Sequence, residues 1–188
     1  MNVDSPTSTL GRDLRALRKS RGMTLEAVAK ALGKSVGWIS QVERDISNPE
    51  ISALREFAEL YQVPMSLFFG SAVVPSGEEG RIVRAAGRRR IGEGTEGFVE
   101  ELLSPDLTDS FEVIHSSFSP GAKMMDGRVR PTQEVVYMVS GKLDVWIGEA
   151  QFTVGAGDSF RVKNERLRWA NPYSETATTV WVISPPVY

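Results

Sequence analysis

TLEAVAKALGKSVGWISQVER, residues 24–44, decides the fold of the first part of the chain, because it predicts two short helices joined by a tight turn. At its start four apolar residues recur at i, i+3, i+4 and i+7, the spacing that puts one apolar stripe on an α-helix. They are Leu25, Val28, Ala29 and Leu32. Gly33 ends this helix, since glycine takes a positive φ at little steric cost, and Ser35 caps a second one.

The second helix has one side that we expect to be buried and one that faces outward. The predicted buried residues are Ile39, Val42 and Ile46. The outward residues are small, polar or apolar, whereas an ordinary surface helix carries charges there. They are Val36, Gly37, Trp38, Ser40 and Gln41.

With its flanks, this stretch resembles the helix-turn-helix of the xenobiotic-response-element family of bacterial regulators, which includes the phage repressors. Small Ala29 at the helix crossing, Gly33 at the turn and Ile39 in the second helix stand where the family places those residue types. The resemblance extends over residues 10–69, from LGRDLRALRKS to VPMSLFF, and implies the family's whole five-helix domain.

The resemblance also assigns two charged residues a structural role. Arg18 and Glu43 fall where the family has an ion pair between the first helix and the recognition helix. Asp45 departs from the family, which usually has glycine after Glu-Arg. Aspartate tolerates the left-handed region better than most residues, so only the local turn is affected.

By the same resemblance, the second helix of the stretch reads DNA bases. Gln41 can bond to adenine, Val36 can contact a thymine methyl group, and Gly37 lets backbone and DNA approach closely. The predicted DNA-binding residues are Ser35, Val36, Gly37, Trp38, Ser40, Gln41, Arg44 and Asn48. Two amphipathic helices joined by a glycine are common in helical proteins, so this interpretation depends on the resemblance.

Composition bounds the class of protein. The 188 residues suffice for one large or two small domains, and the absence of cysteine removes disulfides and thiolate chemistry. No apolar run approaches the roughly 20 residues needed to cross a bilayer, so we expect a soluble, cytoplasmic protein without a membrane partner. The net charge is -2, yet the first predicted helix is basic enough for phosphate contacts.

The flanking segments complete a small helical core. Residues 1–9 are expected to form a disordered arm, and the helical domain to span 10–69. Its further core residues are predicted to be Leu10, Leu14, Leu17, Ile51, Leu54, Phe57, Ala58, Tyr61, Leu67, Phe68 and Phe69. Glycine, proline and serine then gather at residues 70–80, which we interpret as a linker.

Residues 81–188 show period-2 alternation with repeated turn signals. About eight to eleven short strands and no long helix predict an all-β sandwich or barrel. The order of motifs resembles the cupin barrel: Gly121, Glu134 and Gly141 match the spacing of the family's first motif. GAGDSF followed by RLRWANP represents the second.

The departures from the cupin pattern concern its metal site. The three positions where the family has histidine ligands are Gly127, Val129 and Leu167 in this chain. One carboxylate, Glu134, cannot hold a transition metal alone, so we predict neither a metal nor another cofactor. The chain's one histidine, His115, lies on an earlier predicted strand and is interpreted as structural.

These substitutions predict a different use of the barrel. Since the family's ligand positions face inward and side chains alternate along strands, six residues are expected to line an apolar pocket for a small organic ligand. They are Met125, Val129, Glu134, Met138, Leu167 and Trp169. Glu134 favours a cationic or hydrogen-bond-donating group, unless it pairs with Arg161 and the barrel is filled.

The resulting fold class has two domains: an all-α five-helix DNA-binding domain followed by an all-β cupin (double-stranded β-helix) barrel at 81–188. It favours a transcription regulator and not an enzyme, namely a metabolite-responsive repressor that dimerises on a palindromic double-stranded DNA operator. Two alternatives stay open. One is a metal-dependent cupin enzyme, a dioxygenase or isomerase, with an appended DNA-binding module, and the other is a DNA-binding antitoxin or scaffold whose barrel binds another protein.

Overall fold

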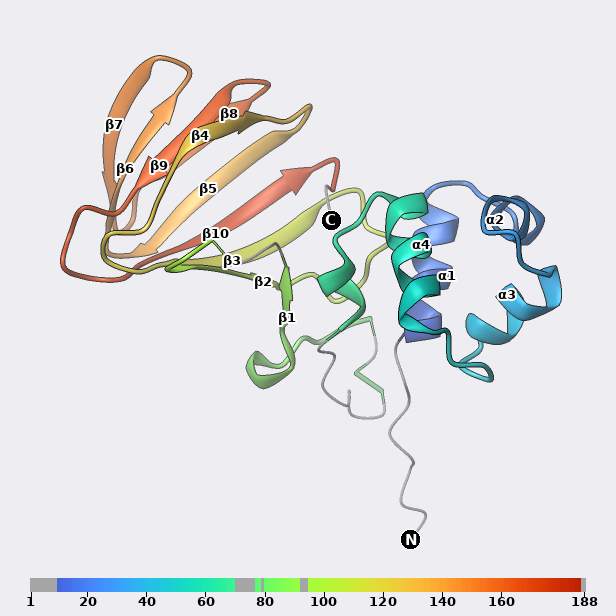
Figure 1. Cartoon of the computed structure of the whole chain (residues 1–188). Helices are drawn as coiled ribbons and strands as arrows, with labels where there is room; N and C mark the ends of the chain where they lie inside the picture. The colour runs from blue at the N-terminus through green and yellow to red at the C-terminus, as the bar shows by residue number, and fades with distance from the viewer. Residues whose placement is uncertain (1–9, 70–76, 79, 92–94, 187–188) are drawn as a thin grey trace, which may run out of the picture. The chain divides into compact units, whose positions relative to one another are not determined.

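The computed structural model describes residues 10–69, 77–78, 80–91 and 95–186 (Figure 1). The predicted arm and most of the predicted linker lie outside these residues. The chain divides into two compact units, the first formed mainly by residues up to Arg89 with Ser104–Asp109, the second by Arg90–Leu103 and Ser110–Val187. No helix in the described ranges is long and apolar enough to span a membrane.

The described part of the first unit is helical. Its α-helices are α1 (Leu10–Ser20), α2 (Leu25–Ala31), α3 (Val36–Val42) and α4 (Ile51–Tyr61). The prediction of five helices is corrected to these four and one 3₁₀ turn, η1 (Met65–Phe68). Pro64 precedes this turn and the extended Phe69 follows it, so the segment is too short to close α-helical bonds and uses i+3 bonds instead.

The helices share a core, and three residues predicted to join it do not. The fully buried residues are Leu14, Leu17, Val28, Ile39, Phe57 and Tyr61. Ile46 is 60% exposed because α3 has ended and Asp45 has turned the chain, and Ile51 is 64% exposed on the first turn of α4. Phe69 is 46% exposed because it lies beyond η1, in extended backbone.

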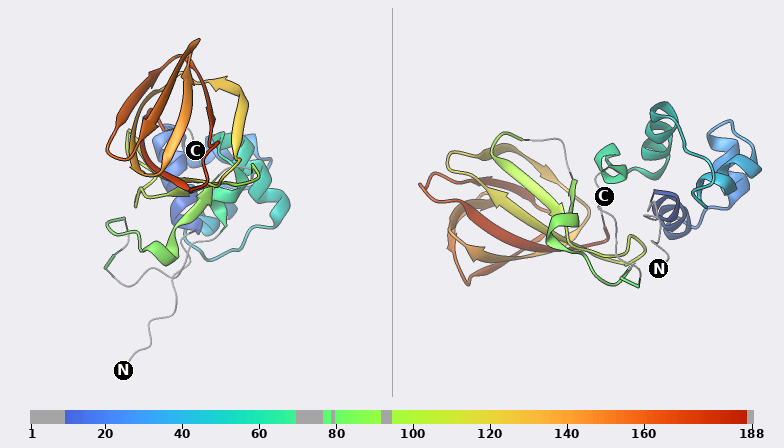
Figure 2. Two further views of the ribbon diagram at one scale, coloured as in Figure 1. Left: turned by 90° about the vertical axis from the view of Figure 1, so that its left-hand side faces the viewer. Right: turned by 90° about the horizontal axis from the view of Figure 1, so that it is seen from below.

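The second unit consists of strands in two sheets (Figure 2). A short 3₁₀ turn, η2 (Ala85–Gly87), precedes the first strand. One sheet has the order β1-β2-β3-β10-β5-β8 and the other β4-β9-β6-β7. Their bounds are β1 Arg89–Ile91, β2 Phe98–Leu102, β3 Glu112–Phe118, β4 Lys123–Val129, β5 Gln133–Ser140, β6 Lys142–Ile147, β7 Ala150–Gly155, β8 Ser159–Lys163, β9 Arg166–Ala170 and β10 Ala177–Ser184. The predicted barrel is therefore two separately hydrogen-bonded sheets in the described residues.

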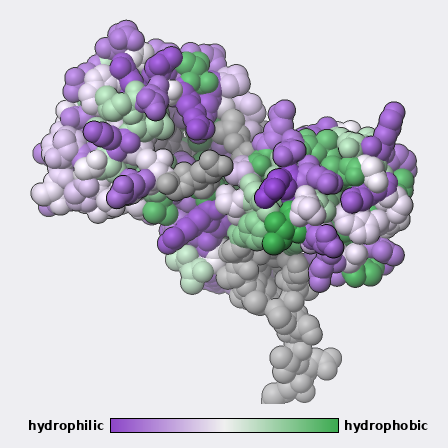
Figure 3. Space-filling model, in the orientation of Figure 1, coloured by the Kyte–Doolittle hydropathy of each residue, from purple (hydrophilic) through white to green (hydrophobic). Residues whose placement is uncertain are grey.

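The two sheets pack face to face. Buried residues of both contribute to one apolar cluster, in which Phe98, Phe118 and Trp169 lie with ring centroids 4.7–4.9 Å apart. β3 and β5 alternate between buried inward and more exposed outward side chains, the period-2 pattern of a strand with one face on a core. Hydrophilic residues cover much of the visible surface of this unit (Figure 3).

Candidate functional site

The helix-turn-helix is fixed by caps that its sequence supplies. Thr24 Oγ1 accepts a hydrogen bond from the Ala27 amide, and Ser35 Oγ accepts one from the Trp38 amide, each at 3.1 Å. Gly33 between the helices has φ 62°, a region in which other residues are strained. These interactions start α2 and α3 at defined residues and so set the face that α3 presents.

Arg18 and Glu43 form a bidentate ion pair. Arg18 Nε and Nη2 donate to the two Glu43 carboxylate oxygens at 2.6 and 2.9 Å, while Nη1 donates to the Met23 carbonyl oxygen at 2.9 Å. The two side chains are only 12% and 4% exposed. The hydrogen bond to Glu43 raises the pKa of Arg18, so the guanidinium remains charged. The pair connects α1, the turn before α2 and the end of α3.

Asp45 makes a second connection that the sequence did not reveal. It has φ 54°, and its Oδ1 accepts a hydrogen bond from the Gly11 amide at 2.9 Å. That amide is in the first turn of α1, where helical amides lack a partner within the helix. A side chain at Gly11 would overlap the Val42 carbonyl oxygen, so α1 and the end of α3 touch through backbone.

The structure distributes the predicted DNA-binding residues unevenly. Exposed side chains belong to Val36, Gln41, Arg44 and Asn48, and the Cβ position of Gly37 has open space around it. Ser40 is half-buried, and the Ser35 hydroxyl is engaged as the α3 cap.

Trp38 faces outward less than predicted. Its ring stacks on Phe57 of α4 at 6.2 Å between centroids, and Lys34 Nζ lies 5.7 Å from the ring centroid. The half-buried indole therefore attaches α3 to α4 as well as bordering the exposed face. The position of Trp38 next to Gly37 in the sequence gave no indication of this packing, because α4 is distant along the chain.

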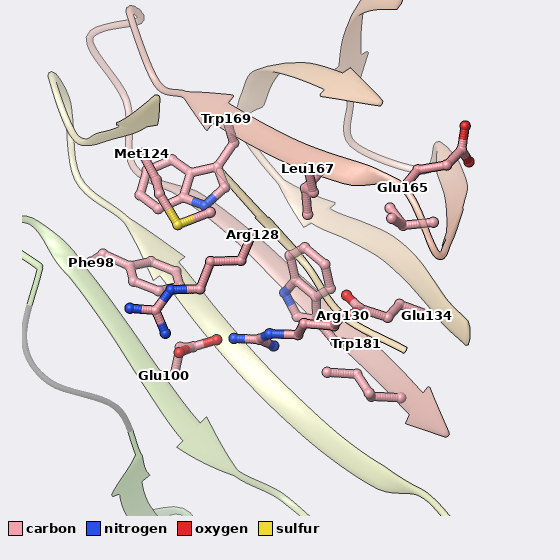
Figure 4. A pocket seen from close by; sticks show the side chains of 12 residues that line it. Phe98, Glu100, Met124, Arg128, Arg130, Glu134, Glu165, Leu167, Trp169 and Trp181 are labelled. Carbon is pink, nitrogen blue, oxygen red and sulfur yellow. The ribbon is translucent and has the colours of Figure 1, made fainter. Parts of the chain in front are cut away.

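A pocket of about 70 Å³ opens between the two sheets (Figure 4). Its lining residues are Phe98, Glu100, Met124, Arg128, Arg130, Glu134, Val162, Glu165, Leu167, Trp169, Trp181 and Ile183. Of the six predicted ligand-binding residues, Glu134, Leu167 and Trp169 lie here.

The other three residues predicted to bind the ligand do not line this pocket. Met125 and Val129 are 45% and 58% exposed and are not in the lining, because they alternate along β4 with the inward Met124 and Arg128. Met124 and Arg128 pair with Trp169 and Leu167 of β9, and the register shifts by two residues between these two pairs. Met138 points inward, but it is four residues along β5 from Glu134, about 13 Å away, and packs in the core.

Gly127 lies within this shifted part of β4. It has φ 59°, and a Cβ there would lie 2.8 Å from the Leu167 carbonyl oxygen, too close for any side chain. The first position of the family's metal motif therefore has no room for a histidine unless β9 moves. Val129 and Leu167, at the other two positions, offer no ligand atoms, so the donor set does not fit a metal. In the described part of the chain no group of three His, Cys, Asp or Glu side chains could hold one.

The charges of the pocket come from both sheets. Glu134 is 5% exposed and accepts a hydrogen bond from Thr132 Oγ1 at 2.7 Å. Burial raises the pKa of Glu100, an effect that the Arg130 guanidinium opposes and the Glu134 carboxylate reinforces. Arg128 and Arg130 point toward Glu100 in Figure 4, yet neither forms an ion pair within 4 Å with any residue that the structure describes.

The predicted alternative partner of Glu134 lies on the other side of the sheet. Arg161 pairs in register with Val135, whose side chain is 45% exposed on the outer face. His115 also faces outward, with Nδ1 3.6 Å from the Glu101 carboxylate of the adjacent strand. Neither residue reaches the pocket.

One buried donor faces the pocket without a partner. Trp181 lines the pocket and is 7% exposed, and its Nε1 has no hydrogen-bond acceptor among the described residues. Trp181, Glu100, Arg128 and Arg130 were not among the pocket residues predicted from the sequence. Trp181, Glu100 and Arg128 differ from other strand residues only by an inward position, which many core residues share, and Arg130 lies beyond the end of β4.

Two family descriptions match the chain. Residues 9–67 match the helix-turn-helix domain, and residues 115–183 match the cupin domain. The chain is 37% identical over 59 residues to the HTH-type transcriptional regulator SutR of Escherichia coli K12, a match that covers 31% of this chain and 33% of SutR. It is 38% identical over 53 residues to the uncharacterized HTH-type transcriptional regulator YazB of Bacillus subtilis 168, covering 28% of this chain and 77% of YazB.

A solved structure is similar over nearly the whole chain. It is an HTH_3-family transcriptional regulator from Vibrio cholerae, 22% identical, with 95% of this chain and 96% of that chain covered and a TM-score of 0.45. The chain spans only a third of the length of SutR.

Proposed function

We propose that this chain, which belongs to the helix-turn-helix family of transcriptional regulators, represses transcription by binding a palindromic DNA operator through α3 and releases it in response to a small metabolite. The observation that carries the DNA-binding part is the asymmetry of α3. Ser35 caps the start of α3, Trp38 packs on Phe57, and Glu43 at its end pairs with Arg18. The opposite side of the helix exposes residues whose side chains have no structural role in the described chain.

The exposed residues suit a major groove. Gln41 is proposed to bond bidentately to an adenine and Val36 to contact a thymine methyl, and each good bidentate contact discriminates by about 1–3 kcal/mol. Arg44 and Asn48 are proposed to contact phosphates, which position the helix without reading sequence. Gly37 lets the helix backbone approach the DNA.

The proposed assembly is a homodimer, because two recognition helices related by a two-fold axis match a palindrome. A second copy of this chain is proposed to pack on the outer face of the six-stranded sheet. Val135, Tyr137, Val139 and Val182 are 42–51% exposed there, and Val182 pairs in register with Val135. Tyr137→Asp should then sediment as a monomer. A dimeric Tyr137→Asp protein would place the interface elsewhere.

The effector is proposed to bind in the pocket between the two sheets. A pocket with an aromatic wall and a few convergent polar groups is typical of small-molecule sites. An enzymatic role through a metal has weaker support, because the residues at the family's metal positions include Gly127, which has no room for a side chain. Elemental analysis of the purified protein tests that alternative directly.

The experiment that tests the proposed function is selection of bound duplexes from a random DNA pool with the full chain. We expect a palindrome whose half-site centres are about 34 Å apart, with affinity that falls steeply with salt. Binding without sequence preference at any salt concentration would contradict the proposal.

A further inference from the structure

The pocket brings together opposite charges that the protein leaves unpaired. Glu134 is deeply buried with a neutral hydrogen-bond partner, Thr132, and no cation within 4 Å among the described residues. Arg128 and Arg130 line the same pocket. Keeping the buried Glu134 carboxylate without a cationic partner is costly, so this carboxylate calls for a positive group from outside, while the exposed Arg128 and the half-buried Arg130 remain available to an anionic group.

The neighbouring side chains separate these charges spatially. In Figure 4 the Trp181 indole nitrogen is on the side of its ring toward Arg128 and Arg130, and Glu134 lies on the opposite side. The unpartnered Nε1–H of Trp181 can donate only to an acceptor. One end of the pocket therefore offers guanidinium and indole donors beside Glu100, and the other end offers the Glu134 carboxylate beside an aromatic ring.

We propose, on the basis of the proposed sensor function, that the effector is a small zwitterion that carries an ammonium and a carboxylate on a short aliphatic body. The carboxylate accepts from Arg128, Arg130 and Trp181 Nε1, and the ammonium donates to Glu134 against the indole ring. Charge-assisted bonds are roughly twice as strong as neutral ones, and a cation on an aromatic face adds to them.

Pocket volume limits the body of the ligand. About 70 Å³ gives room for about five to seven water-sized groups, since each needs about 10–15 Å³ by this measure. That range covers short amino acids with five to seven non-hydrogen atoms, roughly glycine to 4-aminobutyrate. The Phe98, Met124 and Leu167 side chains supply the apolar surface for the methylene groups.

Each single-charge ligand leaves one end of the pocket uncompensated. An amine of the same size satisfies Glu134 but not the guanidiniums, and a carboxylate does the reverse. Either loss should weaken binding by about tenfold or more, because a hydrogen bond to a charged group is lost. Burial raises the pKa of Glu100 at the arginine end, which disfavours the charged form of this carboxyl there.

The test is isothermal titration of the full chain with glycine, L-alanine, β-alanine and 4-aminobutyrate, beside propylamine and propionate. At least one zwitterion should bind about tenfold or more tightly than both single-charge probes. Propylamine or propionate binding as tightly as the best zwitterion, or no heat from any zwitterion, would overturn the ligand class.

Three variants test which end of the pocket binds which charged group of the ligand. Glu134→Gln, which keeps the acceptor for Thr132, should weaken zwitterion binding while leaving propionate unaffected. Arg130→Gln should weaken zwitterions and propionate but not propylamine. Arg161→Gln is the matched control on the outer face and should change neither. Equal loss of all probes in both pocket variants would overturn the assignment.

Operator binding separates this inference from the proposed function. Release of the operator by propylamine alone would support the proposed sensor function and reject a zwitterion as the effector. Tight zwitterion binding without any change in operator affinity would support the ligand class and reject the sensor function.

Discussion

Glu43→Ala should strongly destabilise the helical unit. The substitution removes both carboxylate oxygens from Arg18, whose guanidinium is 12% exposed and retains only its bond to the Met23 carbonyl. Breaking a buried ion pair in this way costs about 3–5 kcal/mol, because a charge is left without its partner. For a domain of this size each kcal/mol shifts the melting temperature by about 4–8 °C, so we expect a decrease of about 12 °C or more.

Thermal unfolding followed by far-UV circular dichroism measures this effect, since the α-helices of the described chain all belong to the first unit. Glu56→Ala, an exposed position on α4, is the control and should stay within about 0.5 kcal/mol of wild type. The double variant Arg18→Met, Glu43→Leu should recover much of the loss, because it leaves no unpaired charge. Unchanged melting of Glu43→Ala together with lost operator binding would refute the reasoning and make Glu43 a DNA contact.

Three further predictions concern the helix contact, the reading face and the pocket. Gly11→Ala should destabilise the helical unit by about 1–3 kcal/mol despite the better helix propensity of alanine, because its Cβ overlaps the Val42 carbonyl oxygen; equal melting would disprove that close approach. Gln41→Ala should relax base preference at one position per half-site by about 1–3 kcal/mol without changing stability, as measured on single-substitution operators, and an unchanged preference would reject the contact. Burial raises the pKa of Glu100, so this carboxyl favours folding below its unfolded pKa and loses that contribution as pH rises through the folded value. Glu100→Gln should therefore melt higher than wild type at about pH 7 and the difference should shrink at about pH 4, near the unfolded pKa; a constant difference would contradict the burial effect.

The helical unit could be predicted well because its determinants are local. The apolar spacing and the Ser35 cap act within a few residues of each other, so they are visible in the sequence. The long-range features were not visible. The hydrogen bond from the Gly11 amide to Asp45 spans 34 residues, and only the fold reveals that the aspartate at this turn also caps α1.

The residues of the pocket were predicted less well than those of the helical unit. Family spacing placed Glu134 and Leu167 in the pocket, since β5 pairs regularly with β8 and β9 pairs regularly with β6. The same spacing failed on β4, where the inward residues are Met124 and Arg128 and not their neighbours Met125 and Val129, and where the pairing with β9 shifts by two residues. A pattern of alternation cannot signal such a shift in advance, and it is what brings Arg128 to the pocket.

The replacement at Gly127 has two consequences that act together. A histidine is excluded by the Leu167 backbone, and the strand is freed to carry Arg128 opposite that residue. Where the family has histidine ligands for a metal, this pocket has guanidinium groups that can donate to an anionic group, and Glu134 remains its acidic residue. A ligand can change operator affinity only if it binds the two states of the protein differently. The pairing of β4 with β9 is irregular between Met124 and Arg128, so Arg128, the side chain proposed to bind the ligand's carboxylate, lies at the end of a segment with fewer backbone pairings than a regular strand, which costs less to move.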